Sequence, residues 1–382
     1  MDSDKAVLFI LGAAHSLNHS LFLVLPPLLS DVSKSLNASF QTLGAISSVS
    51  FLIYGVGALV GGPLSDRLGG VKVAKLSIGL SGASTFVFLL SRDLAAFAAG
   101  MFLIALWASF YHPTSNSLIS RLFAENTGRA MGVHGAAASV GQMFTPTVAY
   151  ILGTVVDWRF AFVFFGVLSI LTALIMGWMP AERDRPSGKG TSIMEFIKAP
   201  NIWLLILFNI AIGLFSRGVE LFFPTFLSVG RGFSGQLAAV ANSLILLLGV
   251  AGQLLGGFAA DRYGSSGVLI AASVGSAAGV LALLLLPLRT IGVALFMVGY
   301  GIAYFSHQPA MTALMGVASP RDLVGAAYGV MFFCTFGLGS VSTMVSGYLA
   351  DASSLETAFW FMGLATLLAL AASIAIHRRI GK

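Results

Sequence analysis

Two stretches of this chain, 195 residues apart, carry nearly the same pattern. "GALVGGPLSDRLGG" (57–70) and "GQLLGGFAADRYGS" (252–265) share the order Gly-x-x-x-Asp-Arg-x-Gly. The same shift places His112 of "SFYHP" on His307 of "YFSHQP", and a shift of 197 pairs "FAFVFFG" (160–166) with "TAFWFMG" (357–363). Because these matches keep a common order and a nearly constant shift, they predict that the chain is an internal duplication.

Composition defines the class of protein. Of 382 residues, 57% are hydrophobic and only 9% are charged, whereas soluble chains carry about 25% charged residues. The mean hydropathy is +0.91. Twelve apolar runs are long enough to cross a bilayer core of about 30 Å: 7–29, 41–65, 73–91, 94–118, 129–153, 158–179, 201–228, 236–260, 267–287, 290–316, 323–349 and 357–376. We therefore expect an all-α integral membrane protein with twelve transmembrane helices, arranged as two pseudo-symmetric six-helix bundles.

One polar segment divides these runs into six and six. The stretch "ERDRPSGKGTSIMEFIKAP" (182–200) is the only long charged segment of the chain. It predicts an N-terminal six-helix bundle over 1–180, a cytoplasmic linker over 181–200 and a C-terminal six-helix bundle over 201–382.

The net charge of +6 reflects membrane topology rather than a nucleic-acid partner. If the N-terminus is cytoplasmic, fifteen Lys and Arg residues fall on that side, and five fall on the other: Lys34, Arg92, Arg159, Arg231 and Arg289. Because Lys and Arg resist translocation, this bias predicts that both termini are cytoplasmic. Together with the compact loops, it predicts a multi-pass protein of a bacterial or archaeal inner membrane.

Six plus six helices, a cytoplasmic linker and an Asp-Arg-x-Gly turn after helices 2 and 8 resemble the major facilitator superfamily over the whole chain. The resemblance implies transport by alternating access, in which this turn holds the cytoplasmic ends of neighbouring helices together in one transport state. The gating residues that it implies are Gly62, Asp66, Arg67, Gly69, Asp261 and Arg262.

Short motifs narrow the resemblance. "AHSLNH" in helix 1, "FYHP" in helix 4 and "FSR" in helix 7 are similar to the fosmidomycin-resistance branch of drug exporters. His19 stands where that branch carries an acid. In helix 5, Gly132, Gly141 and Pro146 are similar to the glycine-rich motif of antiporters, which implies export and adds them to the gating set. Glycines that serve close helix packing would produce the same pattern.

Few ionisable side chains lie inside the predicted spans, where each charge costs about 2.5–3.5 kcal/mol on insertion scales. Glu220 is the only acid clearly within a span and Arg217 the only base, at i and i+3 of helix 7, and five histidines also fall in apolar runs. In the superfamily, helices 1, 4, 7 and 10 line a central cavity. The resemblance therefore implies these substrate-binding residues: His15, Asn18, His19, His112, Arg217, Glu220 and His307. His134, in helix 5, is expected to pack or to gate.

The residue types indicate how transport is coupled to protons. Histidine changes its charge between pH 5 and 8, and burial favours the protonated form of Glu. Arg presents a flat fork that suits carboxylate or phosphonate groups. We expect Glu220, His19 and Arg217 to carry proton coupling, because protonation of Glu220 would release Arg217 for an anionic substrate.

The sequence contains no nucleotide-binding Gly-x-x-x-x-Gly-Lys motif, so we expect an ion gradient to drive transport. We predict a secondary active transporter, most simply a proton-coupled antiporter that exports a small organic compound or drug, with an organic anion favoured by Arg217. Three alternatives stay open: uptake of an organic anion together with protons, transport of a transition metal, and a non-transporting sensor. Metal transport is disfavoured because no Cys or carboxylate joins helix 1 and Arg217 would repel a cation.

No catalytic set of residues indicates an enzyme. We expect a monomer in the lipid bilayer, with a small-molecule substrate and protons as its partners and with no nucleic acid, cofactor or resident metal.

Overall fold

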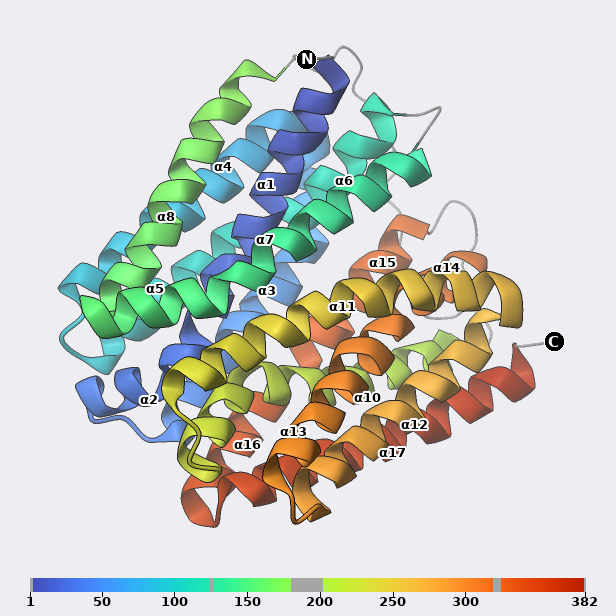
Figure 1. Ribbon diagram of the computed structural model, residues 1–382. Coiled ribbons are helices and arrows are strands. Elements are labelled where there is room, and N and C mark those ends of the chain that lie inside the picture. The colour runs from blue at the N-terminus through green and yellow to red at the C-terminus, as the bar shows by residue number, and fades with distance from the viewer. Residues whose placement is uncertain (1–2, 124–126, 180–201, 319–323, 381–382) are drawn as a thin grey trace. The chain divides into compact units, whose positions relative to one another are not determined.

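The computed structural model describes residues 3–123, 127–179, 202–318 and 324–380, and every regular element within these residues is helical (Figure 1). The first half contains α1 (Ser3–Leu23), α2 (Leu25–Leu36), α3 (Phe40–Leu68), α4 (Gly70–Ser84), η1 (Thr85–Leu90), α5 (Leu94–Ala108), α6 (Tyr111–Leu122), α7 (Thr127–Val155), α8 (Trp158–Ile175) and η3 (Met176–Trp178). The second half contains α10 (Ile202–Thr225), η4 (Phe226–Gly230), α11 (Gly235–Tyr263), α12 (Ser265–Leu285), α13 (Arg289–Val298), η5 (Gly299–Tyr304), α14 (Phe305–Ala318), α15 (Val324–Phe332), η6 (Phe333–Leu338), α16 (Val341–Ala352) and α17 (Leu355–Arg379).

Eleven helical runs among the described residues are long and apolar enough to cross a membrane. A further helix, α7, has 29 residues, as many as α3 and α11, but it is less apolar because it carries His134, Gln142 and Thr145. Helices therefore occupy all twelve predicted runs. The chain is an all-α, multi-pass membrane protein, and the predicted fold class is confirmed.

Helix 1 is longer than predicted. Its apolar run ends near residue 29, whereas α1 and α2 together form a span from Ala6 to Leu36. The last turns, "SDVSKSL" (30–36), are too polar for a hydropathy window, yet they are amphipathic and bury Val32. Asn37, with a φ of 48°, then ends the helix in the left-handed conformation, which is common after a helix C-terminus.

The chain divides into two compact units. Met1–Ala38 and Val49–Gly190 form the first unit, and Ser39–Ser48 and Thr191–Lys382 form the second. The start of α3 therefore groups with the second unit, while the rest of this helix groups with the first. The predicted linker, 181–200, lies outside the described residues.

Small residues let α1 and α7 approach closely in the first unit. A Cβ atom added to Gly141 would lie 1.8 Å from Ser16 Oγ, and one added to Gly12 would lie 2.6 Å from the Cβ of Ala137. Neither space accepts a larger side chain unless a helix moves. This is the small-residue packing that membrane helices use in place of a hydrophobic driving force.

In the second unit, α10 packs between α17 and η6. Phe226 and Phe359 are in ring contact, with centroids 4.3 Å apart. A Cβ added to Gly213 would lie 2.6 Å from the Thr335 carbonyl oxygen, so the two backbones are close. All three π-helical segments that the structure describes (η4, η5 and η6) lie in this unit.

The start of α3 is fixed to α16 within the second unit. The Asp351 carboxylate accepts the backbone N–H groups of Phe40, at 3.2 Å, and of Gln41, at 2.7 Å. It therefore caps the first turn of α3, where a negative charge is favourable. The Thr343 hydroxyl donates to the Gly44 carbonyl at 2.8 Å, and a Cβ on Gly44 would lie only 2.2 Å from the Thr343 carbonyl oxygen.

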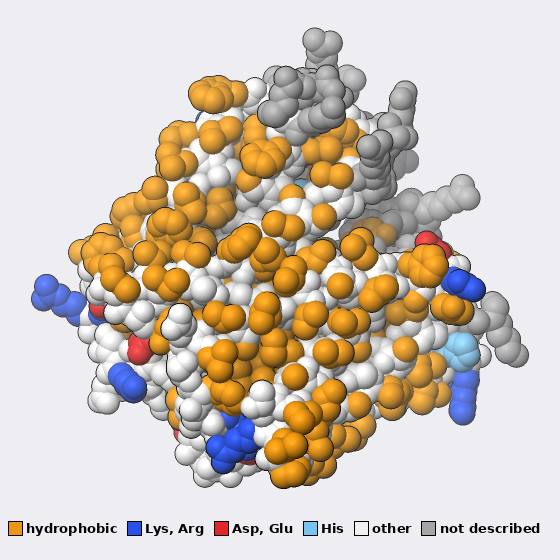
Figure 2. All heavy atoms as spheres, viewed as in Figure 1, with side chains coloured by type: hydrophobic (Ala, Val, Ile, Leu, Met, Phe, Trp, Pro, Cys, Tyr) orange, Lys and Arg blue, Asp and Glu red, His pale blue; other side chains and the backbone are white. Residues whose placement is uncertain are grey.

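Exposed hydrophobic side chains follow the outer face of α11 (Figure 2). Leu254, for example, is 71% exposed, and Leu244, Leu247 and Phe258 are exposed as well. Such a surface is unfavourable in water but suits the hydrocarbon of a bilayer, where a helix satisfies its own backbone polar groups. This face is the expected lipid contact of the second unit.

Candidate functional site

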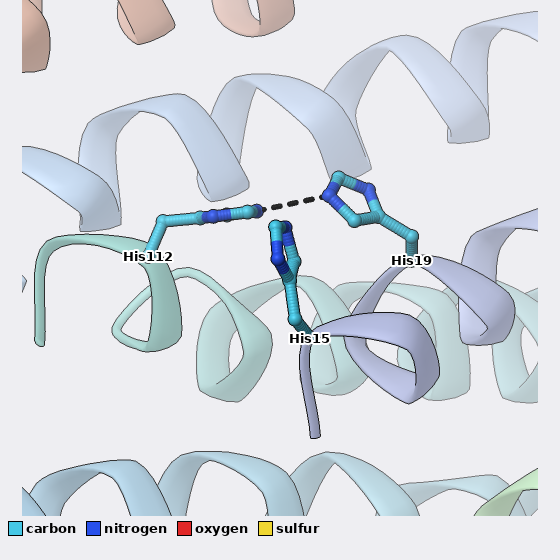
Figure 3. A group of neighbouring side chains, drawn as sticks. All are labelled: His15, His19 and His112. Atoms are coloured by element: carbon cyan, nitrogen blue, oxygen red, sulfur yellow. Dashed lines mark hydrogen bonds between the residues drawn. The ribbon is translucent and has the colours of Figure 1, made fainter. Parts of the chain in front are cut away.

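Three histidines from two helices meet in the first unit. α1 places His15 and His19 one turn apart, and α6 places His112 at its second residue. Nε2 of His112 lies 3.1 Å from Nε2 of His19, and one ring nitrogen from each of the three lies within 4.8 Å of the others. Figure 3 shows the His15 ring pointing toward the line between the other two rings. His112 is buried, whereas His15 and His19 are partly exposed.

A fourth histidine extends this cluster. The His134 ring, from α7, stacks on His15 with centroids 4.4 Å apart and an interplanar angle of 21°. Both ring nitrogens of His134 and Nδ1 of His15 are buried, and none of them has a hydrogen-bond partner among the described residues. We expected His134 to pack or to gate, and the structure places it beside the substrate-binding candidates because α7 packs directly on α1.

Asn18 lies behind the histidines. Its side-chain amide donates to the Ala108 carbonyl at 2.9 Å, and its Oδ1 accepts the Tyr54 hydroxyl at 2.8 Å. The side chain is fully buried. Asn18 therefore joins α1 to α3 and to the end of α5, while the Tyr54 ring stands 6.1 Å from the His112 ring.

A buried ion pair lies on α10 in the second unit. Nη2 of Arg217 is 2.6 Å from Oε2 of Glu220, at the i and i+3 spacing that the sequence predicted. The Arg217 guanidinium also lies over the Phe336 ring of η6, 4.6 Å from its centroid. Arg217 is 8% exposed and Glu220 is 22% exposed, so the carboxylate is the more accessible partner.

Two tyrosines of the π-helical segment η5 surround this ion pair. Tyr300 and Tyr304 stack on each other with centroids 4.7 Å apart, and both interact electrostatically with Arg217 and Glu220. The Tyr300 hydroxyl donates to the Ser216 carbonyl at 3.3 Å. Tyr304 thus stands between the ion pair and His307, whose ring centroid is 4.8 Å from that of Tyr304.

His307 is engaged by its own helix. Its Nδ1 bonds the Tyr304 carbonyl oxygen one turn earlier, and the side chain is buried. The His307 ring also contacts the Phe208 ring, with centroids 5.9 Å apart. Among the predicted substrate-binding residues, His307 is therefore placed next to the tyrosines rather than next to another histidine.

The two Asp-Arg-x-Gly turns have the same backbone conformation. Gly69 has φ 92° and ψ 132°, and Gly264, 195 residues later, has φ 86° and ψ 139°. Other residues rarely adopt a positive φ of this kind. Each glycine caps the next helix, α4 or α12, and thus ends one span and begins the next within a single residue.

The other predicted gating residues differ in their surroundings. Arg67, Asp261 and Arg262 are exposed at the ends of α3 and α11, whereas the side chain of Asp66 lies outside the described residues. No atom of the described residues lies within 4 Å of a Cβ on Gly62 or on Gly132, in contrast to the tight packing at Gly141. Pro146 lies within α7 without ending that helix.

The structure brings the predicted site residues into two groups, one in each unit. His15, His19 and His112 form the first, with Asn18 behind them. Arg217 and Glu220 form the second, with His307 one tyrosine away. Tyr54, Tyr300 and Tyr304 were not predicted from the sequence as site residues. Tyr300, Tyr304 and His307 nevertheless recur at helical spacing in "YGIAYFSH" (300–307), which would place them on one face of a helix.

Comparison with known proteins gives the wider context. The sequence profile of the Major Facilitator Superfamily matches residues 8–343. The gentisate transporter of Corynebacterium glutamicum is 26% identical, over 91% of this chain and 82% of that protein. The fosmidomycin resistance protein of Escherichia coli K12 is 23% identical, over 94% of this chain and 91% of that protein. A crystal structure of a bacterial homologue of the human lysosomal transporter Spinster has the same fold, with a TM-score of 0.80 at 18% identity over 99% of this chain and 98% of that one.

Proposed function

The chain belongs to the major facilitator superfamily, and we propose that it is a proton-coupled transporter that moves a small organic anion together with a proton. Membership makes it a transporter of small molecules rather than an enzyme. The observation that carries the proposal is the Arg217–Glu220 ion pair on α10. A permanent cation inside the membrane is costly, so an anion must accompany Arg217 throughout the transport cycle.

The pair suits the joint transport of a proton and an anion, which is the alternative to antiport that the sequence left open. With Glu220 ionised, Arg217 is neutralised from within its own helix. When Glu220 takes up a proton, the guanidinium loses its partner and accepts a substrate carboxylate or phosphonate, for which its planar fork is suited. Loss of that proton restores the internal pair and releases the substrate. The greater exposure of Glu220 supports its role as the proton acceptor.

The aromatic surroundings restrict the substrate class. Arg217 is surrounded by the aromatic side chains of Phe336, Tyr300 and Tyr304. Such a site accepts a compact organic anion, above all an aromatic one, better than a hydrated inorganic ion. The relative named for gentisate, an organic acid anion, and the relative named for fosmidomycin resistance both fit a transporter of small organic compounds.

Topology and direction complete the proposal. The fifteen-to-five distribution of Lys and Arg supports cytoplasmic termini in a bacterial or archaeal inner membrane. The resemblance of helices 1, 4, 5 and 7 to drug exporters and antiporters favours export, so antiport with export is the second candidate function. The protein acts as a monomer by alternating access, with Gly62, Asp66, Arg67, Gly69, Asp261, Arg262, Gly132, Gly141 and Pro146 as the proposed conformational residues.

Proton flux in proteoliposomes tests this proposal. The wild-type protein is reconstituted with a trapped pH-sensitive dye and challenged with aromatic carboxylates, aliphatic carboxylates and phosphonates. We expect an anion gradient to drive protons across the membrane in the same direction as the anion. Protons that move against the anion would instead make the protein the antiporter that the sequence motifs predict, and absence of flux with every anion would overturn the proposal.

Variants of Glu220 and Arg217 test whether this ion pair couples proton movement to anion transport. Glu220→Gln should abolish proton movement while Arg217 still exchanges labelled anion for unlabelled anion, and Arg217→Ala should abolish both. A second ion pair of the same unit, Arg231 with Glu356 at 3.3 Å, provides the matched control. Glu356→Gln removes the same kind of charge from a more exposed pair and should leave coupling intact.

A further inference from the structure

The geometry points to a binding site for one divalent transition-metal cation of the zinc type, formed by His15, His19 and His112. Each of the three supplies one ring nitrogen, and these nitrogens lie within 4.8 Å of one another. The site lies wholly within the first unit. It does not depend on the ion pair of α10 or on the identity of the transported anion.

The distances fit a metal site as well as the hydrogen bond between His19 and His112. Tetrahedral Zn–N bonds of about 2.0–2.1 Å place two ligand nitrogens about 3.3–3.4 Å apart. Nε2 of His19 and Nε2 of His112 are already 3.1 Å apart. The His15 ring points between them (Figure 3), and its nitrogen lies within 4.8 Å of theirs, so it must come closer by up to about 1.4 Å to reach the same spacing.

The chemistry of the donors selects the class of ion. Neutral imidazole suits Zn²⁺, Cu²⁺, Ni²⁺ and Co²⁺, whereas Mg²⁺ and Ca²⁺ prefer oxygen ligands. Three histidines leave one coordination position of a tetrahedral ion open, as in sites that also bind a water molecule or an anion. His15 and His19 are partly exposed, so an ion can reach the site.

Buried polar atoms without partners give a second and independent observation. Nδ1 of His15 and both ring nitrogens of His134 are buried and have no hydrogen-bond partner among the described residues. Burial of such atoms normally costs about 1–3 kcal/mol each. An ion on the other ring nitrogen of His15 would fix that ring as the Nδ1–H tautomer, and the stacked His134 ring limits its rotation. We therefore assign His134 as a positioning residue rather than a ligand.

The sequence predicted no resident metal, and metal transport was disfavoured because no Cys or carboxylate joins the apolar run of helix 1 (7–29) and Arg217 would repel a cation. In the structure the third ligand comes from α6 instead. Arg217 belongs to the second unit and is neutralised by Glu220 at 2.6 Å. Neither argument therefore applies to the three-histidine cluster itself.

Equilibrium metal binding tests the inference. Full-length protein without a polyhistidine tag is purified in detergent, stripped with a chelator, and titrated with Co²⁺ and Zn²⁺ in competition with a chromogenic chelator. We expect one ion per chain and the visible ligand-field bands of tetrahedral Co²⁺. Single changes of His15, His19 or His112 to Ala should weaken binding by at least about 100-fold, which exceeds the usual effect of a second-shell change.

Two controls separate the site from adventitious binding. His377, whose Nδ1 bonds Ser266 Oγ at 2.9 Å near the C-terminus, lies outside the cluster, so His377→Gln should bind Zn²⁺ as the wild type does. His134→Phe keeps an aromatic ring against His15 and should retain one ion with at most about 10-fold weaker binding. Variants are compared only where their melting in detergent matches that of the wild type.

Each outcome has a defined meaning. Absence of stoichiometric Zn²⁺ and Co²⁺ binding by the wild-type protein would overturn the site, even if anion transport proceeds as proposed. Binding that survives His19→Ala would overturn it as well. Movement of radiolabelled zinc across proteoliposomes would identify the ion as cargo, and retention of one ion through anion transport would identify it as resident. Both of these results require the site.

Discussion

Neutralising Glu220 alone should destabilise the second unit far more than neutralising both members of its ion pair. Arg217 and Glu220 are 2.6 Å apart, and their side chains are 8% and 22% exposed. At an effective dielectric constant of about 20, charges at this distance attract by about 6 kcal/mol, part of which is offset by lost hydration. Removing one partner of a buried pair costs about 3–5 kcal/mol, whereas replacing both is often nearly neutral. We therefore expect Glu220→Gln to cost about 3 kcal/mol and the double change to cost less than half of that.

A double-mutant cycle measures this coupling. Wild type, Glu220→Gln, Arg217→Gln and the double variant are unfolded in the same detergent, and unfolding is followed by tryptophan fluorescence. The exposed pair of Arg231 with Glu356 serves as the control, for which we expect a coupling below about 1 kcal/mol. If the effects of the two single changes add to within about 0.5 kcal/mol, the residues are energetically independent. The ion pair then does not neutralise Arg217, and the reasoning fails.

Three further predictions concern the backbone and its packing, and melting in detergent checks each of them. Gly141→Leu should lower the stability of the folded protein by at least about 1–3 kcal/mol, because α1 leaves no room for the side chain. Gly132→Leu should lower it little, because no atom of the described residues lies within 4 Å of a Cβ at this position. Gly69→Ala and Gly264→Ala should each cost about 1–3 kcal/mol because both positions have a positive φ, and near-neutral results would contradict the shared turn. Asp351→Ala removes the cap of α3 and should lower the stability of the folded protein by about 0.5–2 kcal/mol. An unchanged stability would contradict this cap.

Hydropathy predicted the fold because the bilayer imposes one rule on every span. A helix that crosses hydrocarbon must be long, apolar and internally hydrogen-bonded, and these properties are visible along the sequence. Hydropathy fails for segments that are helical but polar. "SDVSKSL" (30–36) is polar and still helical, and α7 has enough polar residues to fall below the hydropathy of the other spans.

The candidate site was only partly predictable. An ionisable residue inside an apolar span can be recognised from the sequence, but the residues that pack against it from other helices cannot. Arg217 and Glu220 were paired correctly because i and i+3 spacing on one helix fixes their proximity. His134 joins His15 only through the packing of α7 on α1, which depends on small residues in two distant segments. Tyr300 and Tyr304 surround the ion pair through contacts between helices, for which one sequence gives no direct signal.

The π-helical segments give the second unit a freedom of register that an ordinary helix lacks. η5 contains Tyr300 and Tyr304, and η6 contains Phe336, so the aromatic groups around Arg217 all sit on wide turns. A π turn holds one residue more than an α turn. If that extra residue passes along the helix, every side chain it passes rotates by about 100° around the axis. The chain thus carries, next to its ion pair, a means of exchanging phenol groups for other side chains while the two ends of each helix stay in place.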